Sequence, residues 1–232
     1  MKYDIFELLR DNSYPGRGII IGATEDGAKT AVAYFIMGRS VNSRNRIFES
    51  TEDGIRTKAF DESKMVDPSL IIYHPVREVG GELVVTNGDQ TDTIRDFLER
   101  GDSFEAALRT REFEPDAPNF TSRISGVVNE RSGDYKLSIL KAADGGKYCL
   151  RETFEYPAMP GVGHFIHTYK CDGNPIPAFE GEPEEIAITG SADEFAEKLW
   201  ENLNPDNKVS LYVRFRDKAT GDVWERIFNK NG

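Results

Sequence analysis

Short apolar segments separated by tight turns make up most of this chain, and this alternation is what most limits how it can fold. Segments such as residues 31–37 and 135–142 have the length and composition of β-strands. Helical spacing of apolar residues is confined to three stretches, at residues 3–10, 91–108 and 191–203. Because most strands follow one another directly, their sheets should be antiparallel. We predict an α+β fold of two stacked, mostly antiparallel sheets covered by helices.

Local signals place the ends of the predicted elements. Ser191 and Glu194 form a capping box that begins one helix. Thr91 or Asp92, and then Ser103, are predicted to cap two others. Besides the two segments named above, strands are predicted at residues 19–21, 55–60, 70–76, 82–86, 122–128, 147–154 and 164–171, with a closing hairpin of 209–215 and 223–228.

Composition limits the partners of the chain. Its formal net charge is -11 and its pI is near 4.9, so long-range attraction to nucleic acid or to an anionic membrane has the wrong sign. No apolar run approaches the ~20 residues that cross a bilayer, and no signal-peptide pattern is present. Cys149 and Cys171 are expected as reduced thiols. We predict a cytoplasmic protein, and a single domain over residues 1–232 because no Gly-, Ser- or Pro-rich linker divides it.

Three arginines crowd into residues 38–46, directly after the apolar segment 31–37: Arg39, Arg44 and Arg46. Guanidinium groups this close repel one another unless an anion lies between them, and their planar forks match phosphate or carboxylate oxygens. One interpretation is therefore a pocket for a small anion. The other is a solvated surface network in which the arginines pair with the acids that follow: Glu49, Glu52 and Asp53.

Two further polar segments lie where predicted strands end or begin. Residues 87–92 close a strand and open a helix, which gathers free backbone N–H groups and short polar side chains. Turn and cap chemistry explains most of this segment but gives no reason for Gln90. Arg123 lies where a loop enters a strand, facing either a pocket or solvent. His164 and His167 would point to opposite faces of a strand, so we expect no bound metal.

Taken together, these segments resemble the archaeal-type IMP cyclohydrolase family. The resemblance runs in order from residue 14 to about residue 182 and is carried by Gly16-Arg17, Gly38-Arg39-Ser40, Asn45-Arg46, Tyr73, Asn87-Gly88, Thr91-Asp92, Thr121-Ser122-Arg123-Ile124 and residues 164–169. The loop after Arg39 is longer than expected for the family, and Ser122 stands where proline is expected. The C-terminal hairpin looks like an addition.

The resemblance implies a fold and a reaction. The fold is that of the N-terminal-nucleophile hydrolases, helix-sheet-sheet-helix, without a terminal nucleophile. The reaction closes the purine ring of 5-formamidoimidazole-4-carboxamide ribotide to give IMP and water, without a cofactor. Tyr73 would donate or relay a proton and Arg123 would stabilise the formyl oxygen. Substrate contacts are assigned to Arg39, Arg44, Asn45, Arg46, Asn87, Gln90, Thr91 and Thr121.

Two alternatives remain open beside this hypothesis. One is a catalytically silent module that binds purine nucleotides on the same scaffold. The other is an amide cyclase or hydrolase that acts on a different anionic substrate. The partner in the main hypothesis is a small purine ribotide, and a homo-oligomer is possible.

Overall fold

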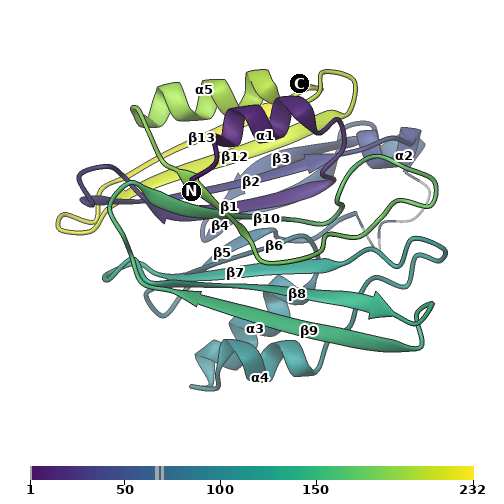
Figure 1. The fold of residues 1–232 in the computed structure, drawn as a ribbon, viewed down its shortest axis with the longest axis horizontal. Coiled ribbons are helices and arrows are strands. Elements are labelled where there is room, and N and C mark those ends of the chain that lie inside the picture. Colours follow the sequence, from purple (N-terminus) through teal and green to yellow (C-terminus); the bar gives the residue numbers. More distant parts are fainter. Residues whose placement is uncertain (1, 66–67, 69–70) are drawn as a thin grey trace.

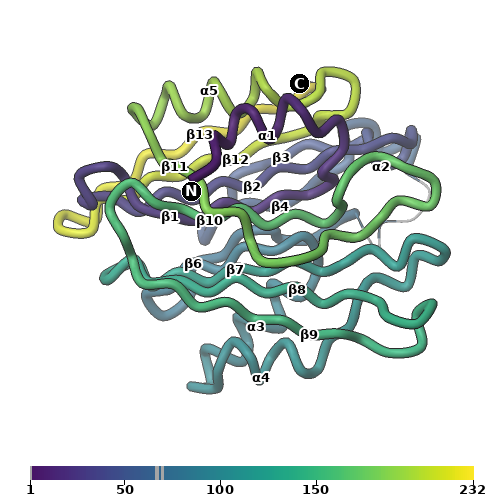
Figure 2. Tube along the Cα trace, in the orientation of Figure 1, coloured from purple at the N-terminus to yellow at the C-terminus, as the bar shows by residue number. Residues whose placement is uncertain are grey.

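Two antiparallel sheets lie face to face, with helices on the outer side of each (Figure 1). The structure is a computed structural model that describes residues 2–65, 68 and 71–232. Every strand pair within the two sheets is antiparallel, which confirms the predicted α+β class. Figure 2 shows both chain ends on the side of the six-stranded sheet.

The first sheet has six strands in the order β11-β10-β1-β2-β12-β13. Its strands are β1 (Arg17–Ala23), β2 (Lys29–Met37), β10 (Val162–His167), β11 (Glu184–Ala187), β12 (Lys208–Asp217) and β13 (Val223–Asn229). Its outer face carries α1 (Ile5–Asp11) and α5 (Ala192–Asn202).

The second sheet has seven strands in the order β3-β4-β5-β6-β7-β8-β9. Its strands are β3 (Arg46–Thr51), β4 (Gly54–Ala59), β5 (Val76–Val79), β6 (Glu82–Thr86), β7 (Arg123–Asn129), β8 (Tyr135–Ala143) and β9 (Tyr148–Tyr156). Its outer face carries α3 (Gln90–Glu99) and α4 (Phe104–Arg109), while the short α2 (Val41–Arg44) and a 3₁₀ turn (Glu62–Lys64) lie in connections.

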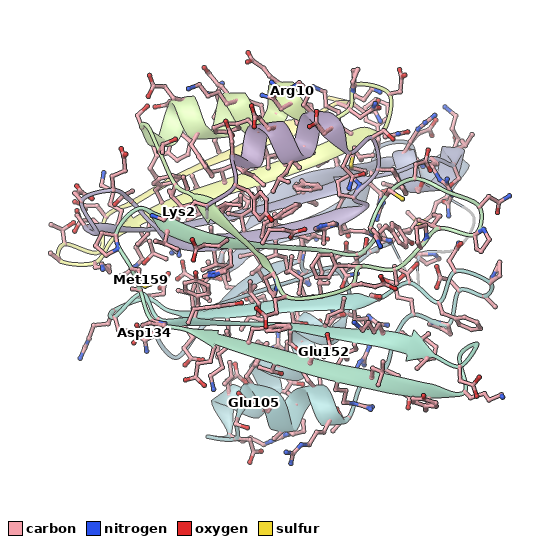
Figure 3. All side chains as sticks on the ribbon, in the orientation of Figure 1. Lys2, Arg10, Glu105, Asp134, Glu152 and Met159 are labelled. Atoms are coloured by element: carbon pink, nitrogen blue, oxygen red, sulfur yellow. The ribbon has the colours of Figure 1, made fainter. Side chains whose placement is uncertain are left out.

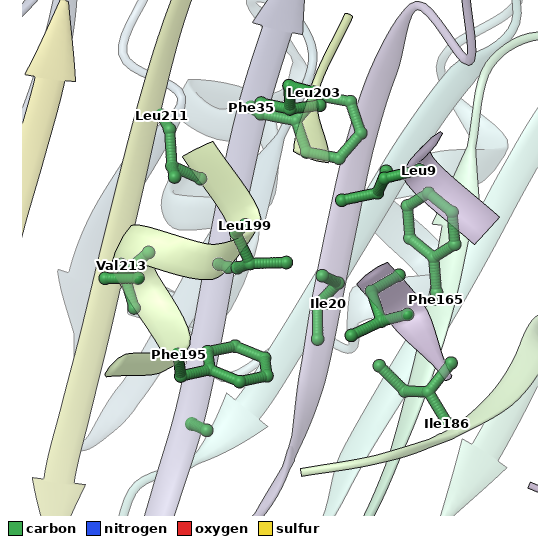
Figure 4. Packing of buried hydrophobic residues seen from close by; sticks show 14 of the residues in the cluster. Leu9, Ile20, Phe35, Phe165, Ile186, Phe195, Leu199, Leu203, Leu211 and Val213 are labelled. Carbon is green, nitrogen blue, oxygen red and sulfur yellow. The ribbon is translucent and has the colours of Figure 1, made fainter. Parts of the chain in front are cut away.

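The central strands are apolar throughout because both of their faces are covered. Successive side chains of a strand point to opposite faces. Ile20 of β1 therefore joins the cluster beneath α1 and α5, whereas Ile19 and Ile21 join the cluster between the sheets. Figure 4 shows Leu199 of α5 in the cluster that also contains Ile20. Side chains fill the space between the layers (Figure 3).

Several predicted elements need correction. The helix predicted to begin after Thr91 or Asp92 starts at Gln90, with Asp89 at its N-cap. The strands β3 and β11 were not predicted, because both contain charged residues in alternation with few apolar ones. The predicted strand 70–76 lies partly outside the described residues, and of its described part only Val76 belongs to a strand.

Other predictions are confirmed. Ser103 caps α4, and Ser191 with Glu194 forms a capping box on α5. The two thiols, Cys149 and Cys171, are free. The C-terminal hairpin forms, and its first strand pairs with β2, so it is an integral part of the sheet. In the described part of the chain, no helix is long and apolar enough to cross a membrane.

Truncating a buried side chain of α5 tests the packing of this helix against the six-stranded sheet. Leu199 has no exposed surface, so Leu199→Ala should lower the free energy of unfolding by about 2–5 kcal/mol, from lost burial and the cavity left behind. Urea denaturation followed by circular dichroism measures this. Glu201→Ala on the exposed side of the same helix should change it by less than about 0.5 kcal/mol. Equal effects would contradict the assignment of Leu199 to the core.

Candidate active site

A group of buried polar side chains lies between the sheets. Arg17 on β1, Tyr34 on β2 and Arg46 on β3 each lie on the strand face that carries the apolar residues packed between the sheets. All three side chains therefore point inward. Tyr73, from the connection before β5, places its hydroxyl 2.9 Å from that of Tyr34. Thr57 fixes the Tyr73 backbone by accepting from its N–H at 2.8 Å. What we call the inter-sheet cluster of arginines and tyrosines consists of Arg17, Tyr34, Arg46 and Tyr73.

Arg46 is the most unusual member of this cluster. The residue has 0% exposed surface, and its Nε donates to the Ser43 carbonyl at 2.8 Å. Its Nη1 is buried and has no hydrogen-bond partner among the described residues, and none of their carboxylates forms an ion pair with it. Burial lowers the pKa of Arg46, and the charge of Arg17 lowers it further. An enclosed guanidinium with an unused donor is costly unless an anion binds to it.

Arg17 is balanced by a buried carboxylate. Its Nη2 lies 3.8 Å from Oε2 of Glu114, which is 2% exposed. Burial opposes the charge of Arg17, but Glu114 and the nearby Tyr169 outweigh it and raise the pKa of Arg17. Burial also raises the pKa of Glu114, although Arg17 and Arg123 oppose that change. Glu114 is therefore a carboxyl group that holds a proton more readily than an ordinary glutamate.

Two stacked tyrosines extend the cluster toward the surface. The rings of Tyr14 and Tyr169 lie 5.7 Å apart, and the Tyr169 hydroxyl is 2.6 Å from Oγ1 of Thr121. Burial raises the pKa of Tyr169. The Thr121 backbone N–H donates to Asp116 at 2.6 Å, and its carbonyl accepts from the Glu114 N–H at 2.8 Å. Thr121 thus joins Tyr169 to the loop that carries Glu114.

Arg123 belongs to a second group, at the start of α3. Its Nη1 donates to Gln90 at 2.6 Å and lies 2.8 Å from Asp89. Gln90 in turn donates to the Asn87 side chain at 3.0 Å. An added Cβ at Gly88 would lie 2.4 Å from Nη1 of Arg123, so a side chain at this position would displace that guanidinium. Gln90, which turn chemistry did not explain, therefore positions Arg123.

The other side chains predicted to contact the substrate form hydrogen bonds within the protein. Asn45 donates to the Asp61 carbonyl and accepts from its N–H, both at 2.8 Å, which ties the start of β3 to the segment after β4. Thr91 lies inside α3, with its hydroxyl 2.7 Å from that of Thr86. Arg44 ends α2 and donates to the Gly38 carbonyl at 2.9 Å.

Arg39 lies at the surface rather than beside Arg46. It donates to Asp172 at 2.5 Å and to the Gly173 carbonyl at 2.9 Å, and its guanidinium lies 5.0 Å from the centre of the Tyr14 ring. Two of the three acids proposed as its surface partners bond elsewhere: Glu49 pairs with Arg56 and Lys58, and Asp53 with Arg77. Arg39 therefore stands at the outer edge of the site.

Sequence reasoning missed three central groups. Tyr34 lies within an apolar strand, where nothing in the local pattern separates it from core. Glu114 lies between Phe113 and Pro115 in a segment interpreted only as the end of a helical region. Arg17 was noted as part of a motif but was given no role. The apolar neighbours Phe113 and Pro115 were the one available signal for Glu114.

Sequence comparisons identify the family to which this chain belongs. Residues 14–221 match the model of the IMP cyclohydrolase-like protein family. The chain belongs to this family. The matched residues include β12. The prediction that the whole C-terminal hairpin is an addition to the family was therefore wrong.

Curated relatives agree with this membership. An IMP cyclohydrolase of Haloquadratum walsbyi is 32% identical over 221 residues, covering 93% of this chain and 98% of that protein. One from Methanopyrus kandleri is 30% identical over 183 residues, covering 72% and 89%. One from Methanococcus aeolicus is 27% identical over 162 residues, covering 68% and 75%.

The raised pKa of Glu114 makes a testable contribution to stability. Its folded-state pKa exceeds its unfolded value, so its stabilising effect is complete below about pH 4, where the unfolded carboxyl is protonated, and is lost as pH rises through the folded-state pKa. The free energy of unfolding of the wild type minus that of Glu114→Gln should therefore fall as pH rises from about 4. Urea denaturation across that range measures it. The exposed control Glu112→Gln should show no such fall, and a flat difference for Glu114→Gln would contradict the burial effect.

Proposed function

We propose that this protein converts 5-formamidoimidazole-4-carboxamide ribotide to IMP and water. Membership of the IMP cyclohydrolase-like family supports the reaction. The structural observation that carries the proposal is the enclosed Arg46. Its Nη1 has no hydrogen-bond partner in the part of the chain that the structure describes, and it would donate to an oxygen of the ribotide phosphate. The layer order of helices, sheet, sheet and helices also supports a relation to the N-terminal-nucleophile hydrolases.

The reaction needs positioning and two proton transfers. The carboxamide nitrogen attacks the formyl carbon, and the formyl oxygen then leaves. One proton from the carboxamide nitrogen and one from the formamide nitrogen end on that oxygen, which gives water and the closed ring. A carboxamide is a weak nucleophile, so holding it against the formyl carbon can supply ~7–11 kcal/mol of the barrier reduction.

The inter-sheet cluster supplies candidate groups for proton transfer. The hydroxyls of Tyr34 and Tyr73 share a hydrogen bond, so either can pass a proton to the other. Glu114 holds a proton more readily than an ordinary glutamate and lies within electrostatic range of Arg17 and Arg123. We assign Tyr73 as the donor to the departing oxygen, with Glu114 as a second acid. Arg123, oriented by Gln90, would stabilise the charge that develops on that oxygen.

Binding requires the outer edge of the site to rearrange. Arg46 is enclosed, so a phosphate reaches it only when the covering side chains move. Arg39 is the group suited to this movement, because its ion pair with Asp172 is roughly half exposed and its guanidinium lies over Tyr14. In this proposal Arg39 exchanges Asp172 for the phosphate and closes the site from outside. Arg17, whose side chain is 12% exposed, adds a second positive charge near Arg46.

Turnover tests the proposal directly. Purified wild-type protein incubated with the formylated ribotide should produce the absorbance change of IMP. Tyr73→Phe and Arg123→Ala should each lower kcat by ~10²–10³, the usual cost of losing a transition-state donor. Tyr148→Phe, on an exposed position of β9, is the control and should keep the wild-type rate. Tight IMP binding without turnover by the wild type would contradict catalysis and favour a binding module.

The phosphate assignment is tested separately by affinity. Arg46→Lys keeps the charge but loses the planar fork, so it should weaken IMP binding about tenfold or more in calorimetry. Arg39→Lys should weaken it less, because Arg39 is assigned to the outer edge. Arg56→Lys, which alters an exposed pair with Glu49, is the matched control. Thermal unfolding of each variant separates loss of binding from loss of fold, and wild-type affinity in folded Arg46→Lys would remove Arg46 from the site.

A further inference from the structure

Asp116 ends a short chain of hydrogen bonds beside the inter-sheet cluster. Its Oδ1 accepts from the Thr121 backbone N–H at 2.6 Å, and its Oδ2 accepts from the Thr121 hydroxyl at 2.5 Å. The same hydroxyl lies 2.6 Å from that of Tyr169. Asp116 is half-buried, whereas Thr121 and Tyr169 are 1% and 4% exposed. The chain therefore runs from a partly solvated carboxyl group to a buried phenol.

The direction of this chain follows from the number of protons available. A carboxylate oxygen only accepts hydrogen bonds, and a hydroxyl group has a single proton to donate. Thr121 donates its proton to Asp116, so the bond between Thr121 and Tyr169 uses the proton of Tyr169. The Tyr169 oxygen is then left with acceptor capacity only. In the part of the chain that the structure describes, Thr121 is its one hydrogen-bond partner, so that capacity is unused.

The ring that carries this oxygen is held by its neighbours. Tyr14 stacks on the Tyr169 ring at 5.7 Å. Gly16, whose φ is 82°, lies against the same ring. An added Cβ at Gly16 would lie 2.4 Å from Cδ2 of Tyr169, so a side chain at this position would displace the ring. Packing and the bond to Thr121 together fix the position of the Tyr169 oxygen.

The positively charged groups of the site are donors, whereas the Tyr169 oxygen is an acceptor. Burial raises the pKa of Tyr169 and the charge of Arg17 opposes that change, which places Arg17 within electrostatic range of the hydroxyl. Arg46 and Arg123, assigned to the phosphate and to the formyl oxygen, also only donate. A fixed acceptor beside these donors is suited to an N–H group of the ligand.

Ring closure supplies one N–H group in a defined position. The carboxamide nitrogen of the ribotide attacks the formyl carbon and becomes N1 of IMP, where it keeps one hydrogen. We propose that the Tyr169 oxygen accepts this N–H in the ribotide and in IMP, and that Asp116 is a positioning residue that holds the Tyr169 proton on Thr121. This role rests on the proposed cyclohydrolase function. It selects for a hydrogen at N1, because an unprotonated N1 would face an oxygen that presents only lone pairs.

A reversal of nucleotide preference tests the direction of the chain. AMP has no hydrogen at N1, so the wild type should bind IMP about tenfold more tightly than AMP in calorimetry. In Asp116→Asn the amide donates to Thr121, which frees the Thr121 proton for Tyr169 and turns the Tyr169 proton toward the ligand. This variant should bind AMP at least as tightly as IMP, and its kcat/KM for the formylated ribotide should fall about tenfold. Glu112→Gln, an exposed neighbour with the same change in net charge, should keep the wild-type preference.

The ratio of the IMP and AMP affinities distinguishes this role from a structural one, because a distorted site would lose both nucleotides equally. Equal wild-type affinities, or an unchanged ratio in folded Asp116→Asn, would overturn the proposal. If Asp116→Asn does not fold, Thr121→Val replaces it. That change breaks the chain and should bring the two affinities together, so a retained preference for IMP would overturn the proposal. A wild type that binds IMP without turnover, but whose preference reverses in Asp116→Asn, would contradict the proposed activity and support the role of Asp116.

Discussion

A guanidinium group enclosed between two sheets, with no carboxylate of the described residues in an ion pair with it, is the constraint on which the rest of this structure depends. Removing such a charge from water is expensive, and the Ser43 carbonyl satisfies only part of Arg46. The neighbouring polar groups offset part of this cost. Tyr34 and Tyr73 bring hydroxyls into an apolar layer, and Glu114 places a carboxyl group beside the second arginine, Arg17. An interior built in this way is suited to a phosphorylated ligand.

The two-sheet architecture explains how so much polarity is held between apolar layers. Alternation along β1 and β3 turns Arg17 and Arg46 toward the same interior that Ile19 and Phe48 fill further along those strands. Apolar packing on both sides of β1 and β2 keeps this interior rigid. On the outer face of the same sheet, His167 and Glu184 form a hydrogen-bonded pair, so the sheet carries polar groups on both of its sides.

The sequence was enough to predict the class of fold and the family, since turns and apolar alternation define antiparallel strands and the motifs occur in family order. It could not separate Arg39 from Arg46. Both lie in one basic segment, but α2 reverses the chain between them, so β3 begins with Arg46 facing inward while Arg39 stays at the surface. Burial of single charged side chains depends on tertiary packing, which local patterns do not encode.

The role of Arg46 is most directly tested by a crystal structure of the protein with IMP bound. The account predicts a phosphate oxygen within hydrogen-bond distance of Nη1 of Arg46, with Arg39 released from Asp172 and turned toward the phosphate. A phosphate bound elsewhere, with Nη1 of Arg46 out of contact with the ligand, would contradict it.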